Sequence, residues 1–248
     1  MVVLNSHIPH SRRCGAADSK TGVHFMAIAT GEIYASPSGQ STRRRLEVVA
    51  AELFYRQGYT KTSVREILSA LGMTPGAMYN HFRSKEELLY SIASRNHAEL
   101  EEQLSAALGR GGGDPPAQLW EAAQAVTVFC TMYRMEAIVS RSEVQHLPAA
   151  QANEMLESER RVRRGFERVL EKGREKEIFR IFLPDGRPAD IPVTAKAILD
   201  LCINAGLWFR PEGRLSAEDI ATQYGVLALQ AAGVTPAEVQ SVVARVPR

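Results

Sequence analysis

A group of polar and aromatic side chains between residues 74 and 85 could bind nucleic acid. Tyr79 offers a ring and a hydroxyl to a thymine methyl or a phosphate, and Asn80 offers the amide that suits an adenine edge. Gly76 lacks a side chain, so its backbone could approach a sugar-phosphate backbone closely. The residues that we expect to face DNA are Arg43, Arg44, Arg45, Thr62, Ser63, Thr74, Pro75, Gly76, Tyr79, Asn80, His81 and Lys85.

This set of residues also has an alternative interpretation. Each residue could instead be a solvated or helix-capping side chain, and this alternative is strongest for Asn80 and His81. Lys85 begins a helix, where its ammonium and the free backbone N–H groups could together hold a phosphate.

Two short helices joined by a tight turn must position these residues. Apolar residues recur at helical spacing over 64–71, and Ser63 with Glu66 forms a capping-box pattern in front of them. Gly72 then marks a turn, and Thr74 can cap the next helix. Such an arrangement is a helix-turn-helix, whose second helix lies in the major groove of DNA.

The rest of the chain predicts further helices and no strand. A helix starts at Ser41 or Thr42 and ends at Gly58, and another starts at Ser84 and runs to about residue 108. A Gly/Pro-rich break follows at 109–116. We then expect helices near 117–135, 141–147, 149–178, 193–209 and 216–232, and a short one from Pro236. The predicted fold class is therefore all-α, with a three-helix helix-turn-helix domain followed by a larger helical ligand-binding and dimerisation domain.

Composition and charge divide the chain into three parts. Residues 1–40 lack periodicity and are expected to form a disordered arm. Residues 41–97 carry nine Lys/Arg against five Asp/Glu, whereas residues 98–248 carry 18 against 21. A basic domain followed by a slightly acidic one fits a DNA-binding domain joined to a domain that does not contact DNA. We place the DNA-binding domain at 41–90 and the effector-binding and dimerisation domain at 91–248.

Several classes of protein are disfavoured. No run of about 18 apolar residues suggests a membrane span, and no signal sequence precedes residue 40, so a cytoplasmic location is expected. The three cysteines are widely spaced and indicate neither a disulfide framework nor a metal site. We expect no cofactor and no enzymatic activity, because HExxH, GxSxG, Walker and dinucleotide-binding patterns do not occur.

The segment 45–92 resembles the tetracycline-repressor-like (TetR) family of bacterial regulators. The resemblance rests on Ala50–Phe54, Gly58-Tyr59, Thr62–Ile67, Pro75–Phe82 and Lys85–Leu88. It implies a homodimer that binds a double-stranded DNA operator and is released from it by a small molecule. With residues 208–216, the body is also similar to regulators of lipid and steroid breakdown, many of which respond to coenzyme A thioesters.

The effector site is predicted on weaker grounds. An acyl-CoA would need an apolar slot and cations for its phosphates, and arginines cluster at 160–168. The alternative is that these arginines form a solvated face, because glutamates near them in the sequence can pair with them. The residues that we expect to line the pocket are Phe129, Tyr133, Met155, Arg160, Arg163, Phe166, Asn204 and Trp208.

Two helices, near 193–209 and 216–232, carry the predicted dimer contact. The first is apolar nearly all round, and two such helices from each subunit could pack as a four-helix bundle, as the family resemblance implies. A plain monomer core is the alternative. The residues expected at the interface are Ile198, Cys202, Ile220, Tyr224, Leu227 and Ala231.

Two other functions compete with a ligand-responsive regulator. One is a DNA-binding regulator whose body binds another protein and no small ligand, which a solid core would favour. The other is a helical enzyme that merely contains a similar helix pair.

Overall fold

The computed structural model describes residues 41–74 and 76–245, and within them the chain is all-α, as predicted. The expected arm at 1–40 and Pro75 lie outside these residues. The helices are α1 (Thr42–Gln57), α2 (Val64–Ala70), α3 (Lys85–Arg110), α4 (Pro115–Met132), α5 (Arg134–Ser142), α6 (Ala149–Glu175), α7 (Ile191–Trp208), α8 (Ala217–Ala231) and α9 (Pro236–Arg245), with two 3-10 helices, η1 (Met78–Asn80) and η2 (Val144–His146).

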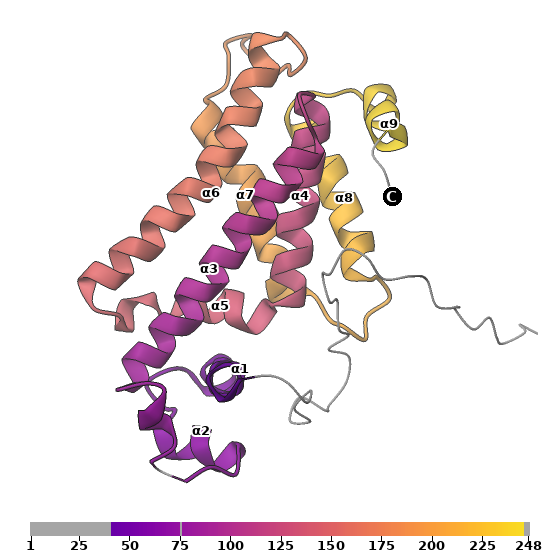
Figure 1. The fold of residues 1–248 in the computed structure, drawn as a ribbon. Coiled ribbons are helices and arrows are strands. Elements are labelled where there is room, and N and C mark those ends of the chain that lie inside the picture. The colour runs from indigo at the N-terminus through magenta and orange to yellow at the C-terminus, as the bar shows by residue number, and fades with distance from the viewer. Residues whose placement is uncertain (1–40, 75, 246–248) are drawn as a thin grey trace, which may run out of the picture.

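The body is built around α4, which packs against α3, α6, α7 and α8 (Figure 1). Its core includes Trp120 of α4 and Phe166 of α6, both buried. At Gly225 of α8 a Cβ atom would lie 2.6 Å from the Trp120 ring, so only glycine lets α8 approach α4 this closely. The helices thus surround one continuous apolar centre.

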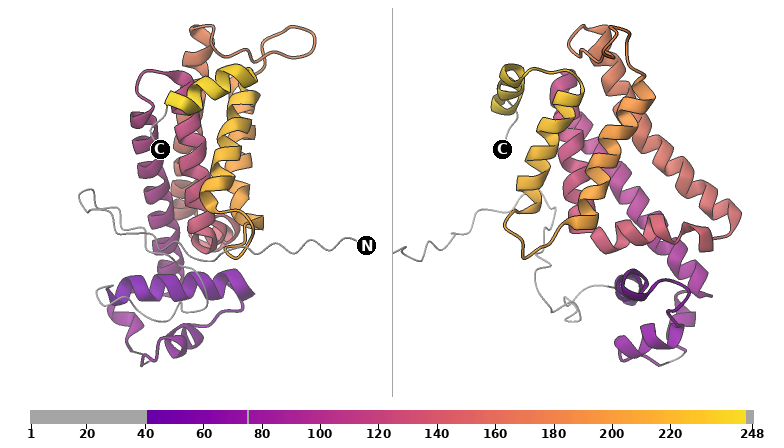
Figure 2. Two further views of the ribbon diagram at one scale, coloured as in Figure 1. Left: turned by 90° about the vertical axis from the view of Figure 1, so that its right-hand side faces the viewer. Right: turned by 180° about the vertical axis from the view of Figure 1, so that it is seen from behind.

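A smaller unit of α1, α2 and η1 lies at one end of the body (Figures 1 and 2). Its core packs Phe54, Met78 and Phe82 against the first turns of α3, and Val139 of α5 and Met155 of α6 belong to the same cluster. Helix α3 runs without interruption across the boundary expected between residues 90 and 91. The small unit is therefore joined to the body through a shared helix and a shared core.

Most helices match the predicted bounds closely, with differences in three places. The helix expected near 141–147 is wrong: these residues are the end of α5 and the 3-10 helix η2. The third helix of the small unit is only the 3-10 turn η1, flanked by turns. The helix expected near 117–135 ends at Met132, where Tyr133 leaves the helical region, and α5 begins immediately after it. Ser41, Ser63 and Ser84 cap α1, α2 and α3 through their side chains, as predicted.

Helix α7 is apolar nearly all round, as expected from the sequence, and it is also long. Its 18 residues have a mean hydropathy of 1.2, enough by length and composition to cross a membrane, and 39% of them are buried inside the chain. The inner face packs on α4, α6 and α8, whereas Val193, Leu207 and Trp208 are exposed. A core helix with one face left for another subunit has the same composition.

Candidate nucleic-acid interface and ligand cleft

The residues that face outward on the small unit gather around η1. Tyr79 leaves 64% of its surface exposed, and Thr74, Gly76 and Asn80 are exposed beside it. Met78 and Phe82, on either side of Tyr79, are buried and anchor the turn in the core. Gly72 has φ +63°, a left-handed conformation that permits the turn between α2 and η1. An aromatic ring held out in water on a fixed turn is suited to contact a partner.

The loop that precedes α2 is held by side chains that the sequence analysis assigned to DNA. The Lys85 ammonium donates to the carbonyl oxygens of Tyr59 and Thr62, both at 2.9 Å, and lies 4.0 Å from the centroid of the Tyr59 ring. Thr62 is 1% exposed, and its hydroxyl donates to the carbonyl of Gly58. The DNA assignment of Thr62 is wrong because the residue is buried, and the Lys85 ammonium is already used to close the loop.

Ser63 is exposed but already engaged. Its backbone N–H donates to a carboxylate oxygen of Glu66 at 2.7 Å, and the Glu66 N–H donates back to the Ser63 hydroxyl at 3.2 Å. The Ser63 hydroxyl also donates to that carboxylate oxygen at 2.8 Å, and the two bonds that the carboxylate accepts hold the pKa of Glu66 below its usual value. Ser63 therefore orders the start of α2 and presents only part of its hydroxyl to a partner.

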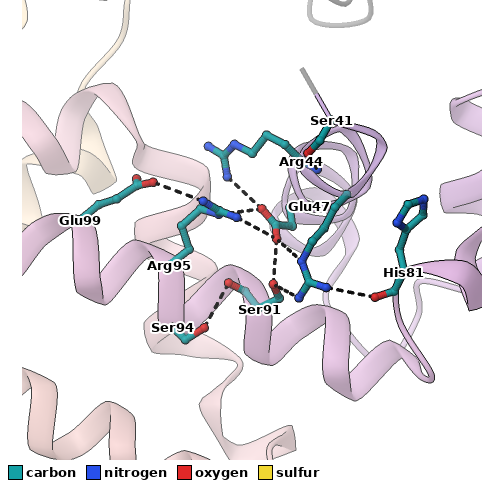
Figure 3. A network of polar contacts seen from close by, with 9 residues as sticks. Ser41, Arg44, Glu47, His81, Ser91, Ser94, Arg95 and Glu99 are labelled. Carbon is teal, nitrogen blue, oxygen red and sulfur yellow. Dashed lines mark hydrogen bonds and ion pairs between the residues drawn. The ribbon is translucent and has the colours of Figure 1, made fainter. Parts of the chain in front are cut away.

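The arginines at the start of α1 turn inward to a buried carboxylate (Figure 3). Glu47 is 0% exposed and accepts from Ser91 at 2.7 Å and from Arg95 at 2.8 Å. Arg43 donates to the His81 carbonyl oxygen at 3.1 Å and to Ser91 at 3.0 Å. We call Arg43, Arg44, Glu47, Ser91 and Arg95 the Glu47 network; it joins α1 to α3.

Arg43 and Arg44 are therefore engaged inside the chain, and their assignment to DNA stays a prediction. The guanidinium of Arg43 also covers the Phe82 ring at 4.3 Å, and Arg44 pairs with Glu47 at 3.5 Å and with Glu136 of α5 at 3.6 Å. Arg45 is half-buried, and its Nε is buried. The side chains of Arg43 and Arg44 thus join α1 to α3 and α5, because Glu47 offers the nearest desolvated negative charge.

Three exposed cations near the turn were missed. Lys61, Arg65 and Arg83 are exposed and form no ion pair within residues 41–74 and 76–245. Sequence alone offered one usable signal: these basic residues lie outside the apolar stripes of the helices and beside the turn. Exposed cations that form no ion pair, beside the turn that carries Tyr79, are available to bind phosphates.

The body contains a cleft of about 430 Å³ between α3 and the first half of α6. Ala98, Ala150 and Met155 contribute apolar surface, and Ser94 and Asn153 contribute polar groups. Its remaining lining residues are His97, Glu101, Glu154, Glu157, Ser158 and Arg161. The volume is within the range of small-molecule sites.

The polar groups of the cleft differ in how they are partnered. Glu101 accepts two bonds from Arg161, both at 2.8 Å, and a third from the Ser158 hydroxyl. These bonds lower the pKa of the Glu101 carboxyl. His97 is only 6% exposed, and neither of its ring nitrogens has a hydrogen-bond partner in the described part of the chain. Burial lowers the pKa of His97 to about 4, so its imidazole is neutral at pH 7.

The eight predicted effector residues do not surround one cavity. Only Met155 lines the cleft; Phe129 and Phe166 are in the body core, and Tyr133 packs on Phe129 with ring centroids 5.0 Å apart. Arg160 pairs with Glu157, and Arg163 with Glu167 at 2.8 Å, as a solvated face would.

Asn204 and Trp208 point to solvent from α7. His97 was missed, although it stands at a stripe position of its helix, three residues before the buried Leu100.

The predicted dimer residues divide into two groups. Ile198, Cys202 and Ile220 are at most 4% exposed inside their own chain, so they cannot contact a second subunit directly, and their assignment is corrected. Tyr224, Leu227 and Ala231 reach the surface of α8. Beside them on α7 are Leu207, at 54% exposed, and Trp208, whose ring meets Tyr224 edge-on at 6.3 Å. The predicted face is thus at the surface on α8, whereas on α7 other apolar residues than the predicted ones are exposed.

Comparisons with known proteins agree with this architecture. The family described as "Bacterial regulatory proteins, tetR family" matches residues 48–92, and the one described as "Tetracyclin repressor-like, C-terminal domain" matches residues 112–232. The HTH-type transcriptional repressor KstR2 of Rhodococcus jostii (strain RHA1) is 30% identical over 197 residues, which cover 75% of this chain and 89% of the relative.

Two solved structures are also similar. The ketosteroid transcriptional regulator KstR2 of Mycobacterium tuberculosis is 26% identical with a TM-score of 0.69, covering 79% of this chain and 96% of that one. AibR, solved in complex with isovaleryl coenzyme A and operator DNA, is 25% identical with a TM-score of 0.64, covering 75% and 96%.

Proposed function

The chain belongs to the tetracycline-repressor-like (TetR) family of bacterial regulators, and on that premise we propose that it is a homodimeric repressor released from a palindromic operator by a small molecule. It is a DNA-binding transcription regulator and not an enzyme. We place its action in the cytoplasm, where bacterial DNA is found.

The observation that carries the DNA interface is the exposed Tyr79 on an anchored turn. Because 64% of this side chain is exposed, the fold does not need it, and its ring and hydroxyl are free for a base or a phosphate. Tyr79→Ala should weaken operator binding by at least about ten-fold, or about 1.4 kcal/mol, without changing thermal unfolding. Fluorescence anisotropy with DNA from upstream of the gene measures the first, and circular dichroism the second. Unchanged operator affinity would place the recognition surface elsewhere.

Phosphate contacts are proposed for Lys61 and Arg65. Replacing Arg65 with alanine should weaken binding to all DNA sequences alike and lower the slope of log K against log salt by about one. Lys85→Ala is the informative comparison, because that ammonium holds two loop carbonyls. It should lower thermal stability as well as affinity, whereas Arg65→Ala should lower affinity alone.

The dimer is proposed to form through α7 and α8. The support is the exposed apolar face that includes Val193, Leu207, Trp208 and Leu227 on two adjacent helices. The double variant Leu207→Glu, Leu227→Glu should be a monomer in analytical ultracentrifugation. It should also lose tight operator binding, because a two-fold symmetric dimer binds both half-sites of a palindrome at once. A dimer that survives both charges would assign the interface to another surface.

A coenzyme A thioester is the proposed class of effector. AibR at 25% identity has been solved with isovaleryl coenzyme A, and KstR2 is titled a ketosteroid regulator. Adding fatty-acyl and steroid-derived CoA thioesters to the protein–operator complex tests this. Release by at least one of them at micromolar concentration supports the proposal, and retention of DNA with all of them refutes it. The cleft beside α6 favours a ligand-binding body over a purely protein-binding one.

A further inference from the structure

His97 presents a hydrogen-bonding group that the fold leaves unused. A buried imidazole without hydrogen-bond partners destabilises the folded state, and native structures rarely keep such a group without a reason. His97 is one of the residues that line a cleft of about 430 Å³, a volume within the range of small-molecule sites. Two independent features, a cavity and an unsatisfied buried group, therefore coincide.

We propose that the α3–α6 cleft binds the uncharged part of the effector, an apolar body with one carbonyl or hydroxyl oxygen hydrogen-bonded to His97. This inference rests on the proposed ligand-responsive function and names the site and chemistry within it. The same chemistry is present in a free alcohol or ketone and in the acyl part of a thioester. A neutral imidazole offers one N–H donor and one nitrogen acceptor, so either a carbonyl or a hydroxyl satisfies it.

The charges around the cleft argue for an uncharged group. Arg161 is the one guanidinium in its lining, and it is already bonded to Glu101 through two N–H groups, so a ligand carboxylate or phosphate would find no free cation among the lining residues. A cation has no free partner either. Glu101 is paired with Arg161, Glu154 accepts from Tyr90, and Glu157 is paired with Arg160 and Arg164.

Helix α3 connects this cleft to the Glu47 network. Ser94 lines the cleft and donates to the Ser91 carbonyl at 3.4 Å, while the Ser91 hydroxyl donates to Glu47 of α1. Arg95, next to Ser94, also pairs with Glu47. A ligand that displaces this part of α3 would therefore act directly on the joint that holds the DNA-reading unit.

The test follows the imidazole itself. The full chain with isotope-labelled histidine is titrated with 1-octanol, octanoyl-CoA and octanoate, and the His97 signal is observed by NMR. His97→Phe identifies that signal among the six histidines by its absence. We expect a saturable shift with octanol, octanoyl-CoA or both, and at least a ten-fold weaker response to octanoate. Response to the alcohol alone indicates a free ligand, and preference for octanoyl-CoA indicates a thioester.

Two results would overturn the inference. One is binding of octanoate as tightly as the uncharged probes; the other is an unshifted His97 signal with both octanol and octanoyl-CoA at their solubility limits. Operator binding is measured separately, so a chain that binds DNA but fails here loses this inference and keeps its proposed function.

Matched variants separate a binding role from a structural one. His97→Phe should retain the helical spectrum and bind the probes at least ten-fold more weakly. Glu159→Gln changes an exposed residue of α6, the other helix of the cleft, that does not line the cleft, and it should bind the probes like the wild type. Equal probe affinity in His97→Phe and the wild type would contradict the assigned contact.

Discussion

Helix α3 has two faces that treat polar groups in opposite ways. Toward α1, buried Glu47 is surrounded by Arg43, Arg44, Ser91 and Arg95, and both carboxylate oxygens are bonded (Figure 3). Toward α6, buried His97 has no hydrogen-bond partner in the described residues. A saturated network fixes one arrangement of two helices, whereas an unsatisfied group in a cleft can be satisfied by something that arrives from outside. The comparison separates a joint between helices from the proposed ligand-binding face on the same helix.

The joint should be the more sensitive face. Glu47→Ala removes a fully buried charge from between three arginines and should lower the free energy of unfolding by about 3 kcal/mol. Urea unfolding followed by circular dichroism measures it. Glu99→Ala is the matched control on α3: its contact to Arg95 is 4.0 Å long and solvent-exposed, so a change below about 0.5 kcal/mol is expected. Similar losses in the two variants would show that the Glu47 network is not a joint.

The face of α3 that packs toward α6 should affect how the free energy of unfolding depends on pH. Burial lowers the pKa of His97 from 6.5 to about 4, so the unfolded chain binds more protons between these values. The part of the free energy of unfolding that comes from neutral His97 is fully present above pH 6.5 and is lost as the pH falls toward 4. Glu101, Arg161 and Arg141 face the same imidazole, and Glu101 opposes the shift.

His97→Phe measures the size of this contribution. Between pH 7 and pH 5 the wild type should lose about 2 kcal/mol more than His97→Phe. At pH 7 the variant should be at least as stable as the wild type, because an unpartnered polar group has been removed. A markedly less stable variant at pH 7 would mean that the imidazole is a structural group and would remove the contrast between the two faces.

The smallest effect is expected at the edge of the cleft. Tyr90 donates to Glu154 from α3 to α6 across exposed surface. Tyr90→Phe should change the free energy of unfolding by about 0.5 kcal/mol or less, because water replaces the lost bond. A loss near that of Glu47→Ala, in the same urea experiment, would mean that α3 and α6 are as tightly joined as α3 and α1.

Local sequence patterns predicted the helix caps and the turn around Tyr79 well. The caps at Ser41, Ser63 and Ser84 act between residues three apart, and such contacts can be recognised in sequence. Tyr79 between apolar Met78 and Phe82 likewise indicated an outward ring between inward anchors. The inward contacts of the α1 arginines were missed because Ser91 and Arg95, which complete the Glu47 network, lie more than 40 residues away from it in the chain.

The pocket was predicted poorly for a related reason. Aromatic residues such as Phe166 were chosen by type, but a large apolar side chain fills a core and does not by itself leave a cavity. The cleft arises where α3 and α6 diverge, and its key group, His97, looks in sequence like one more position on a buried stripe. The predicted dimer residues of α7 were wrong for the same reason: burial of Ile198 and Cys202 depends on how α7 rotates against α4.

By itself the sequence determined the helices, their caps, the turn at Gly72 and the family, because each depends on residues within a few positions of one another. Only the tertiary structure decided which cations are free, which polar groups are satisfied and where a ligand could enter. Those properties depend on contacts between helices distant in the chain, and the free energy of a charge or an imidazole is set by the partners that such contacts bring to it.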